Sequence, residues 1–147
     1  MNIIRSLNRR MMKSRSGSAA VEFAIVAPVF LMMILGMLGG GIYLGAVHSV
    51  RQLTSDVARA TIAGADEGER IFIAKHYVKT NAHSYAFLRQ DKLYISVEDS
   101  DIVANQFDVE IIFYADELPI WNIAGFFPFP NREIKGRASI RNGGFSA

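Results

Sequence analysis

The chain has 147 residues, with 16 Lys and Arg, 14 Asp and Glu and no cysteine, and its formal net charge is +2. The absence of cysteine excludes disulfide bonds, thiolate catalysis and cysteine-ligated metal sites. The positive charge lies at one end, because residues 1–17 hold five bases and no acid, and residues 18–147 carry a net −3. This layout excludes a uniformly basic nucleic-acid binder, and we expect no nucleic-acid partner. The length allows one small domain and a membrane segment.

The first predicted element is a membrane-spanning helix. Residues 23–47 form a run of 25 uncharged residues, most of them apolar. As a helix this run is about 37 Å long, enough to cross a hydrocarbon core of about 30 Å. The bases precede the run, so the positive-inside rule predicts a cytoplasmic N-terminus, with the C-terminal part outside the cytoplasm. We therefore expect a single-pass protein in contact with membrane lipid.

Two other interpretations of this run are a cleaved secretory signal peptide and a buried core helix of a soluble protein. The small residues Gly39, Gly40 and Gly41 would fit a signal-peptide cleavage site. The run is longer than a typical signal-peptide apolar region, however, and it continues past these glycines to Val47. Its length also argues against a soluble core helix.

Glycines within the run have a spacing that favours close helix packing. Gly36 and Gly40 form one GxxxG pair, and Gly41 and Gly45 form another. In lipid, small residues at this spacing let a second helix approach closely. The alternative is a flexible or locally melted stretch, because glycine weakens helices. Pro28 predicts a slight bend.

Glu22 is the only formal charge between Arg15 and Arg51. A carboxylate at the edge of a bilayer is costly unless it is hydrated or neutralised. Glu22 is either a hydrated acid that complements the dipole at a helix start, or a residue with a role in the function of the protein. Its surroundings favour the second interpretation.

The order of a basic leader, Gly17, Ser18-Ala19-Ala20-Val21-Glu22-Phe23 and an apolar helix resembles the processing site of type IV prepilin-like proteins. The wider stretch over residues 16–64 is similar to the TadE-like family of tight-adherence (Flp-type) pilus assembly proteins. The matching features are an AVEFA opening followed by a proline, and a later AR…G sequence. Here they are Ala20 to Ala24 with Pro28, and Ala58-Arg59 with Gly64.

This resemblance implies that a prepilin peptidase cleaves after Gly17 and exposes the amine of Ser18. Glu22, fifth in the mature chain, would then pair with its own amine or a neighbouring subunit's and set the register between subunits. Phe23 stands where major pilins usually have tyrosine, which favours a minor pseudopilin. Implied partners are other pilins and pseudopilins, an inner-membrane assembly platform and an assembly ATPase. The implied location is the inner membrane, with incorporation into the pilus left open.

The apolar helix is predicted to continue beyond the membrane as a stalk. Ala46, Val50, Leu53, Val57 and Ala60 are spaced as one helical stripe, and Gly64 is a candidate helix C-cap. We therefore expect a basic leader over residues 1–17, a transmembrane and stalk helix over 18–64, and an exported head over 65–147.

The head is predicted to have an α+β fold. Acidic residues at 66–69 favour a helix start, and apolar residues recur at helical spacing from Ile71 to Tyr85. Three runs of period two follow, at 93–98, 107–114 and 134–141, as expected for an antiparallel sheet covered on one face by a helix. Opposite charges, Asp108 and Glu110 against Lys135, Arg137 and Arg141, should meet on the outer face.

A proline-rich segment between the second and third strands concentrates four aromatic residues: Trp121, Phe126, Phe127 and Phe129. They either close over the open edge of a small core or form a contact surface for another pilus component or the outer lipid surface. The sequence does not separate these alternatives.

We find no catalytic motif, and we expect no enzyme activity, no cofactor and no metal. His76 and His83 lack an evident third ligand, and Asp99 and Asp101 lack the other ligands of a calcium loop. Two alternatives to a minor pseudopilin remain. One is a permanently anchored, uncleaved membrane adaptor of a secretion system, and the other is a membrane-tethered hydrolase with an unrecognised site.

Overall fold

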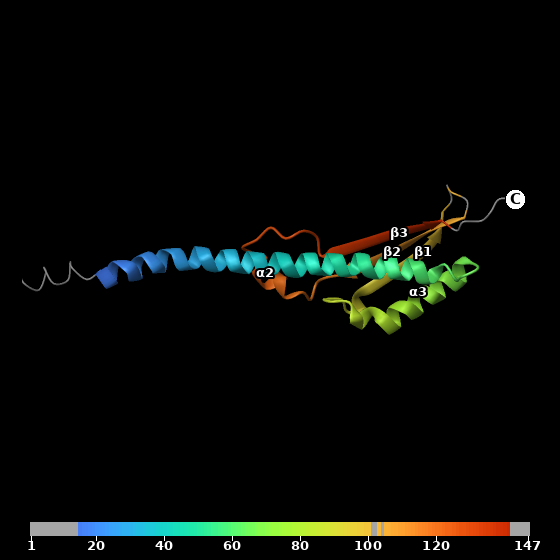
Figure 1. The fold of residues 1–147 in the computed structure, drawn as a ribbon, viewed down its shortest axis with the longest axis horizontal. Helices are drawn as coiled ribbons and strands as arrows, with labels where there is room; N and C mark the ends of the chain where they lie inside the picture. Colours follow the sequence, from blue (N-terminus) through green and yellow to red (C-terminus); the bar gives the residue numbers. More distant parts are fainter. Residues whose placement is uncertain (1–14, 101–102, 104, 142–147) are drawn as a thin grey trace, which may run out of the picture. The chain divides into compact units, whose positions relative to one another are not determined.

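The computed structural model describes residues 15–100, 103 and 105–141, so most of the predicted leader lies outside the described residues (Figure 1). The main elements are α2 (Arg15–Thr61), α3 (Glu67–Asn81), β1 (Leu93–Asp99), β2 (Gln106–Tyr114) and β3 (Glu133–Arg141). Short 3₁₀ turns occupy Ala82–Ser84 (η1), Gln90–Lys92 (η2) and Pro119–Ile123 (η3). The predicted α+β class, with a long N-terminal apolar helix, a second helix and a three-stranded antiparallel sheet, is confirmed.

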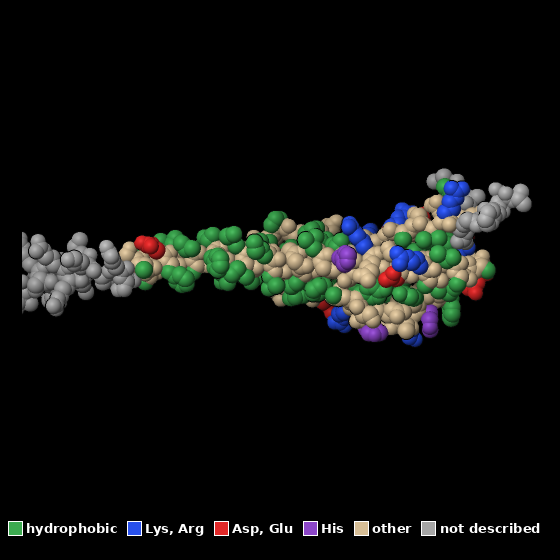
Figure 2. Space-filling model, viewed as in Figure 1, with side chains coloured by type: hydrophobic (Ala, Val, Ile, Leu, Met, Phe, Trp, Pro, Cys, Tyr) green, Lys and Arg blue, Asp and Glu red, His purple; other side chains and the backbone are tan. Residues whose placement is uncertain are grey.

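The chain divides into two compact units, Met1–Leu38 and Gly39–Ala147. We call the second the head unit, and it includes the last 23 residues of α2. In the first unit, nearly all large apolar side chains of α2 are exposed, as Phe23 is at 74%. On the face drawn in Figure 2, hydrophobic side chains follow one another along this part of α2, and the Lys and Arg side chains drawn in blue lie over the head unit.

The core of the head unit lies between α2 and one face of the sheet. The strands are antiparallel in the order β1-β2-β3. Alternate residues of β2 are fully or almost fully buried, as period two predicts. They share one core with the α2 stripe, of which only Ala60 stays partly exposed. The buried members of the two elements are Ala46, Val50, Leu53, Val57, Phe107, Val109, Ile111 and Phe113.

One pair from the predicted cross-strand charge set forms on the opposite face. The register places Glu110 opposite Arg137. Arg137 instead reaches diagonally to Asp108, with 2.8 Å between Nη2 and Oδ2. Both strands therefore keep their polar residues on the face away from the helix.

Close contact between α2 and β3 depends on Gly136. A Cβ at this position would lie 2.3 Å from Thr54 Oγ1 and 3.1 Å from Val50 Cγ1. Thr54 is buried and its hydroxyl donates to the Val50 carbonyl at 2.7 Å. The helix and the strand can approach this closely only because residue 136 has no side chain.

The predicted role of Gly64 as a helix C-cap is wrong. α2 ends at Thr61, and no described glycine has a positive φ, the conformation such a cap requires. A Cβ on Gly64 would instead lie 2.9 Å from the backbone nitrogen of Arg70. Gly64 thus allows the connection to fold back against the start of α3.

α3 begins with a side-chain cap and ends earlier than predicted. Asp66 accepts a hydrogen bond from the Glu69 N–H, as an N-cap should. At the other end, Thr80 and Asn81 donate side-chain hydrogen bonds to carbonyls four residues back, which competes with helix continuation. The 3₁₀ turn that follows still buries Ala82, so the predicted apolar face is kept.

Candidate functional site

The residues of the predicted processing site lie at the start of α2. The helix begins at Arg15, so the Gly17–Ser18 peptide bond lies in its first turn. The Ser18 hydroxyl donates to Glu22 Oε1 at 3.1 Å, one helical turn away. Both side chains are exposed, as is Phe23 after them. This segment therefore presents a carboxylate beside Ser18, at the edge of an apolar surface.

The apolar run is compatible with a membrane anchor. Gly17–Thr61 is long and apolar enough to cross a bilayer, and its most apolar 18-residue window has a mean hydropathy of 2.4. None of that window is buried. An exposed apolar surface of this extent favours a lipid environment over a soluble core.

The glycines proposed for helix packing occupy two kinds of environment. A Cβ on Gly40 or Gly41 would meet no atom within 4 Å, so both could accept a neighbouring helix. Gly45 is already covered, since a Cβ there would lie 2.7 Å from Phe87 of the same chain. Gly36 belongs to the other compact unit, and its packing role stays a prediction.

Most of the aromatic segment packs within the head unit. The Trp121 indole N–H donates to the Ala115 carbonyl, and its ring meets Phe129 edge-on, with 6.0 Å between centroids. A Cβ on Gly39 would lie 2.7 Å from the ring of Phe129. Phe127 is partly buried, with its ring centroid 6.1 Å from that of Phe129. These contacts fit the interpretation in which the aromatics close over a core edge.

Phe126 does not share these contacts. It is 72% exposed, the highest value among the large hydrophobic side chains in the described part of the head unit. Close by, the guanidinium of Arg132 lies 4.9 Å from the centroid of the Trp121 ring, a cation–π arrangement. The segment therefore has a packed side and an exposed aromatic tip.

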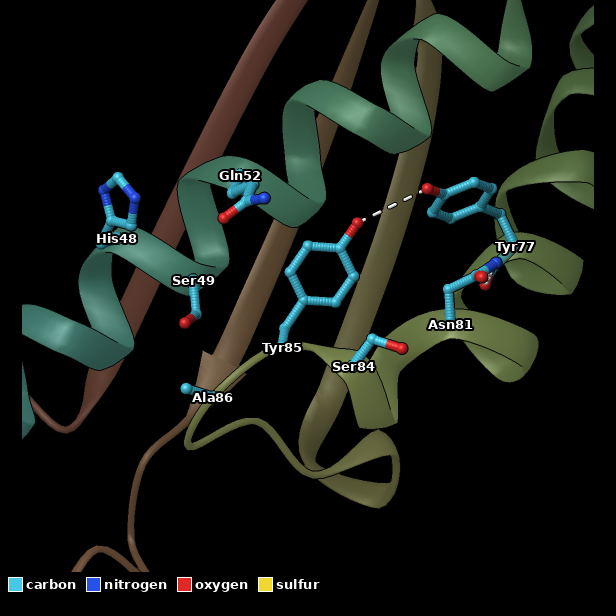
Figure 3. A pocket seen from close by; sticks show the side chains of 8 residues that line it. All are labelled: His48, Ser49, Gln52, Tyr77, Asn81, Ser84, Tyr85 and Ala86. Atoms are coloured by element: carbon cyan, nitrogen blue, oxygen red, sulfur yellow. Dashed lines mark hydrogen bonds between the residues drawn. The ribbon is translucent and has the colours of Figure 1, made fainter.

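A polar groove that the sequence did not predict lies between α2 and the end of α3 (Figure 3). Its volume is about 510 Å³. Its lining side chains are hydroxyl, amide and imidazole groups and one alanine, with no Asp, Glu, Lys or Arg. The lining residues are His48, Ser49, Gln52, Tyr77, Asn81, Ser84, Tyr85 and Ala86.

A chain of hydroxyl groups crosses this groove. The Tyr85 hydroxyl donates to Asp56 Oδ2 at 2.8 Å, so the Tyr77 hydroxyl donates to the Tyr85 oxygen at 3.5 Å. Burial raises the pKa of Tyr85 well above its ordinary value, and the hydrogen bonds with Tyr77 and Asp56 act in the same direction. Tyr85 therefore stays neutral at physiological pH and acts as a structural hydrogen-bond donor.

The described part of the chain holds no group of three or more His, Asp or Glu side chains placed to bind a metal ion. His76 stacks on Phe72, with 6.2 Å between ring centroids. Asp99 is paired with the buried Arg70, and Asp101 lies outside the described residues.

Comparison with known proteins agrees with the resemblance seen in the sequence. Residues 17–59 match the family model described as TadE-like protein. No curated protein and no solved structure matches the chain. The TadE-like family is a pilus-related structural family, so the match associates the chain with tight-adherence pilus assembly. It confirms the predicted resemblance: residues 17–59 are similar to the TadE-like family.

Proposed function

We propose that this chain is a minor pseudopilin of a tight-adherence pilus, cleaved after Gly17 and packed with other subunits through its apolar helix. The observation that carries the proposal is the hydrogen bond between Ser18 and Glu22 at the start of an exposed apolar helix. The α-nitrogen of Ser18 is separated from that hydroxyl by only two carbon atoms. Cleavage would therefore create an ammonium group on the residue whose hydroxyl already contacts the Glu22 carboxylate.

The proposed ion pair has a clear electrostatic purpose. Cleavage removes five bases and changes the formal charge from +2 to −3. Glu22 and the new amine would then be the only formal charges at the N-terminal end of the apolar run. Pairing them within one subunit, or between neighbours, neutralises two groups that are costly at a membrane edge. Such a pair also fixes the axial position of one helix against the next.

The proposed topology follows from the same segment. Bases precede the apolar run, so the leader faces the cytoplasm and the head lies outside it, anchored in the inner membrane. A prepilin peptidase, an inner-membrane assembly platform and the major pilin are the proposed partners. The head would capture other subunits through its exposed surface.

One observation favours the second candidate, an uncleaved membrane adaptor. α2 begins before the Gly17–Ser18 bond, so a peptidase would have to unwind the first turn to reach it. That unwinding is not costly, because the first N–H groups of a helix have no partner within the helix. The position of the helix start therefore hinders cleavage only weakly. The pseudopilin and the uncleaved adaptor differ in their N-terminal residue, which can be measured.

Substitution of Glu22 tests the assembly role. Glu22→Gln should leave the protein in the membrane fraction and remove it from sheared pili, or abolish pili. Glu67→Gln, which changes an exposed carboxylate of the head, is the matched control and should assemble like the wild type. Normal pilus incorporation of the Glu22→Gln protein would refute the role proposed for this carboxylate.

A further inference from the structure

Part of the apolar run belongs to the head unit, and the remainder is a short helix to span the membrane. Gly39 to Val47 are within the head unit, where Gly39 and Ala46 are buried and Ile42, Tyr43 and Val47 pack against the core. The run from Phe23 to Leu38 then has 16 residues, about 24 Å of helix. The hydrocarbon core is about 30 Å thick.

The helical length that is missing has to come from the head side of the helix. Extending the span toward the N-terminus would draw Glu22 into hydrocarbon, which is costly for a carboxylate. α2 continues without interruption into the head unit, so its next turns, from Gly39 onward, must lie at the outer edge of the bilayer. Whatever packs on those turns within the head unit lies at the same depth.

The segment that packs there is the aromatic loop, which we define as residues 118–131. Phe129 and Ile123 contact the helix at Gly39, and the Tyr43 hydroxyl donates to the Asn131 carbonyl at 3.3 Å. The loop has 14 residues and no charged side chain. Figure 1 shows η3 and the segment after it beside α2, beyond the end of the sheet.

The composition of the loop suits the interface between lipid and water. Its one Trp and three Phe belong to the aromatic types that partition into this region. Three prolines carry no N–H, and four other N–H groups bond to carbonyls within the loop. The cost of bringing the backbone into a less polar medium is therefore reduced. Arg132, directly after the loop, stacks on Trp121 and pairs with Asp116, with 3.6 Å between Nη1 and Oδ1.

From these observations we propose that the aromatic loop inserts into the outer interface of the membrane, with Phe126 as the tip that enters the lipid. Leu44, 67% exposed, contributes to the same contact from α2. The loop would seat the head on the bilayer and fix the depth of a short spanning helix. This inference rests on the proposed membrane anchoring, but not on leader cleavage or pilus incorporation.

The absence of cysteine makes the test direct, because one introduced cysteine gives one labelled site. The full chain with Phe126→Cys is labelled with an environment-sensitive fluorophore and placed in phosphatidylethanolamine–phosphatidylglycerol vesicles at a low ratio of protein to lipid. Phe72→Cys is the matched control, since Phe72 is 70% exposed but lies on α3. Met33→Cys, 57% exposed on α2, reports on the anchor itself.

The proposal predicts that the label at 126 loses most of its fluorescence to lipids that carry a nitroxide near the headgroup, and little to aqueous iodide. The label at 72 should show the reverse, and the label at 33 should be quenched by nitroxides deep in the acyl chains. Iodide quenching at 126 equal to that at 72 would overturn the lipid contact while leaving the anchor intact. Protection of 126 from both quenchers would indicate a protein partner and also overturn it. Iodide quenching at 33 would show that the anchoring itself fails.

Discussion

Replacing Gly136 with alanine should loosen the contact between α2 and β3. The new Cβ would lie 2.3 Å from Thr54 Oγ1, well inside the separation at which carbon and oxygen repel. Thr54 cannot turn away without cost, because its hydroxyl is bonded to the Val50 carbonyl in a buried site. Either this hydrogen bond breaks or the helix moves away from the strand.

The size of the effect follows from two opposing terms. Overpacking of a core costs about 1–3 kcal/mol, and removal of a strand glycine returns about 0.5–1 kcal/mol. The expected net loss is about 1–2 kcal/mol, which for a head unit of this size lowers Tm by roughly 5–10 °C.

Thermal unfolding of the full chain in detergent measures this loss, with fluorescence of Trp121, the single tryptophan, as the readout. Gly125→Ala is the control, because a Cβ at that position meets no atom within 4 Å. Adding Thr54→Ala should recover part of the loss, so that the double variant is more stable than the sum of the two changes predicts. A Gly136→Ala protein with the same Tm as the Gly125→Ala protein would refute the packing argument.

Three further predictions use the same unfolding assay. Arg70→Met removes a buried guanidinium that donates to the Gly64 carbonyl at 3.2 Å, so it should cost about 2–3 kcal/mol; an unchanged Tm would contradict this. Arg137→Ala breaks the exposed pair with Asp108 and should cost less than about 1 kcal/mol; a larger loss would mean that this pair is not a surface contact. The raised pKa of Tyr85 means that the folded state holds this proton more tightly than the unfolded state. The stabilisation that comes from this bound proton is fully present below pH about 10 and is lost as the pH rises further. Tyr85→Phe should therefore reduce the fall in Tm at alkaline pH. A variant whose Tm depends on pH as in the wild type would disprove the contribution of Tyr85.

The regular elements could be predicted because each has a period that burial imposes. Phe107, Val109, Ile111 and Phe113 alternate with polar residues, and this alternation fixed which face of β2 is buried. Asp108 and Arg137 carry opposite charges on matching faces, and they pair as expected. Local sequence carried this information, because strand and helix periods follow from backbone geometry.

The features that were missed depend on contacts between distant residues. Arg70 is buried, with its guanidinium 4.6 Å from the centroid of the Phe107 ring, although arginine is a residue type usually found at the surface. Gly64 looked like a helix cap and instead makes room for the start of α3. The contact of Phe129 with Gly39 joins positions 90 residues apart, so no local pattern could show where the membrane part of α2 gives way to the head.

The geometry of the helix accounts for only part of the predicted processing site. Ser18 and Glu22 lie within hydrogen-bonding distance, as their spacing on a helix predicts. The leader that would be removed lies mostly outside the described residues, and cleavage is a covalent event that depends on a peptidase. The polar groove around Tyr85 was not predicted, because its lining comes from two helices whose packing the sequence does not give.

The N-terminal residue of the native protein shows whether the leader is removed. The protein should be purified from membranes and from sheared pili of cells that contain the prepilin peptidase, and both samples should be sequenced from the N-terminus. We expect a chain that begins at Ser18 in both samples. A chain that still carries its leader in both, or one cut at the glycines 39–41, would contradict this expectation.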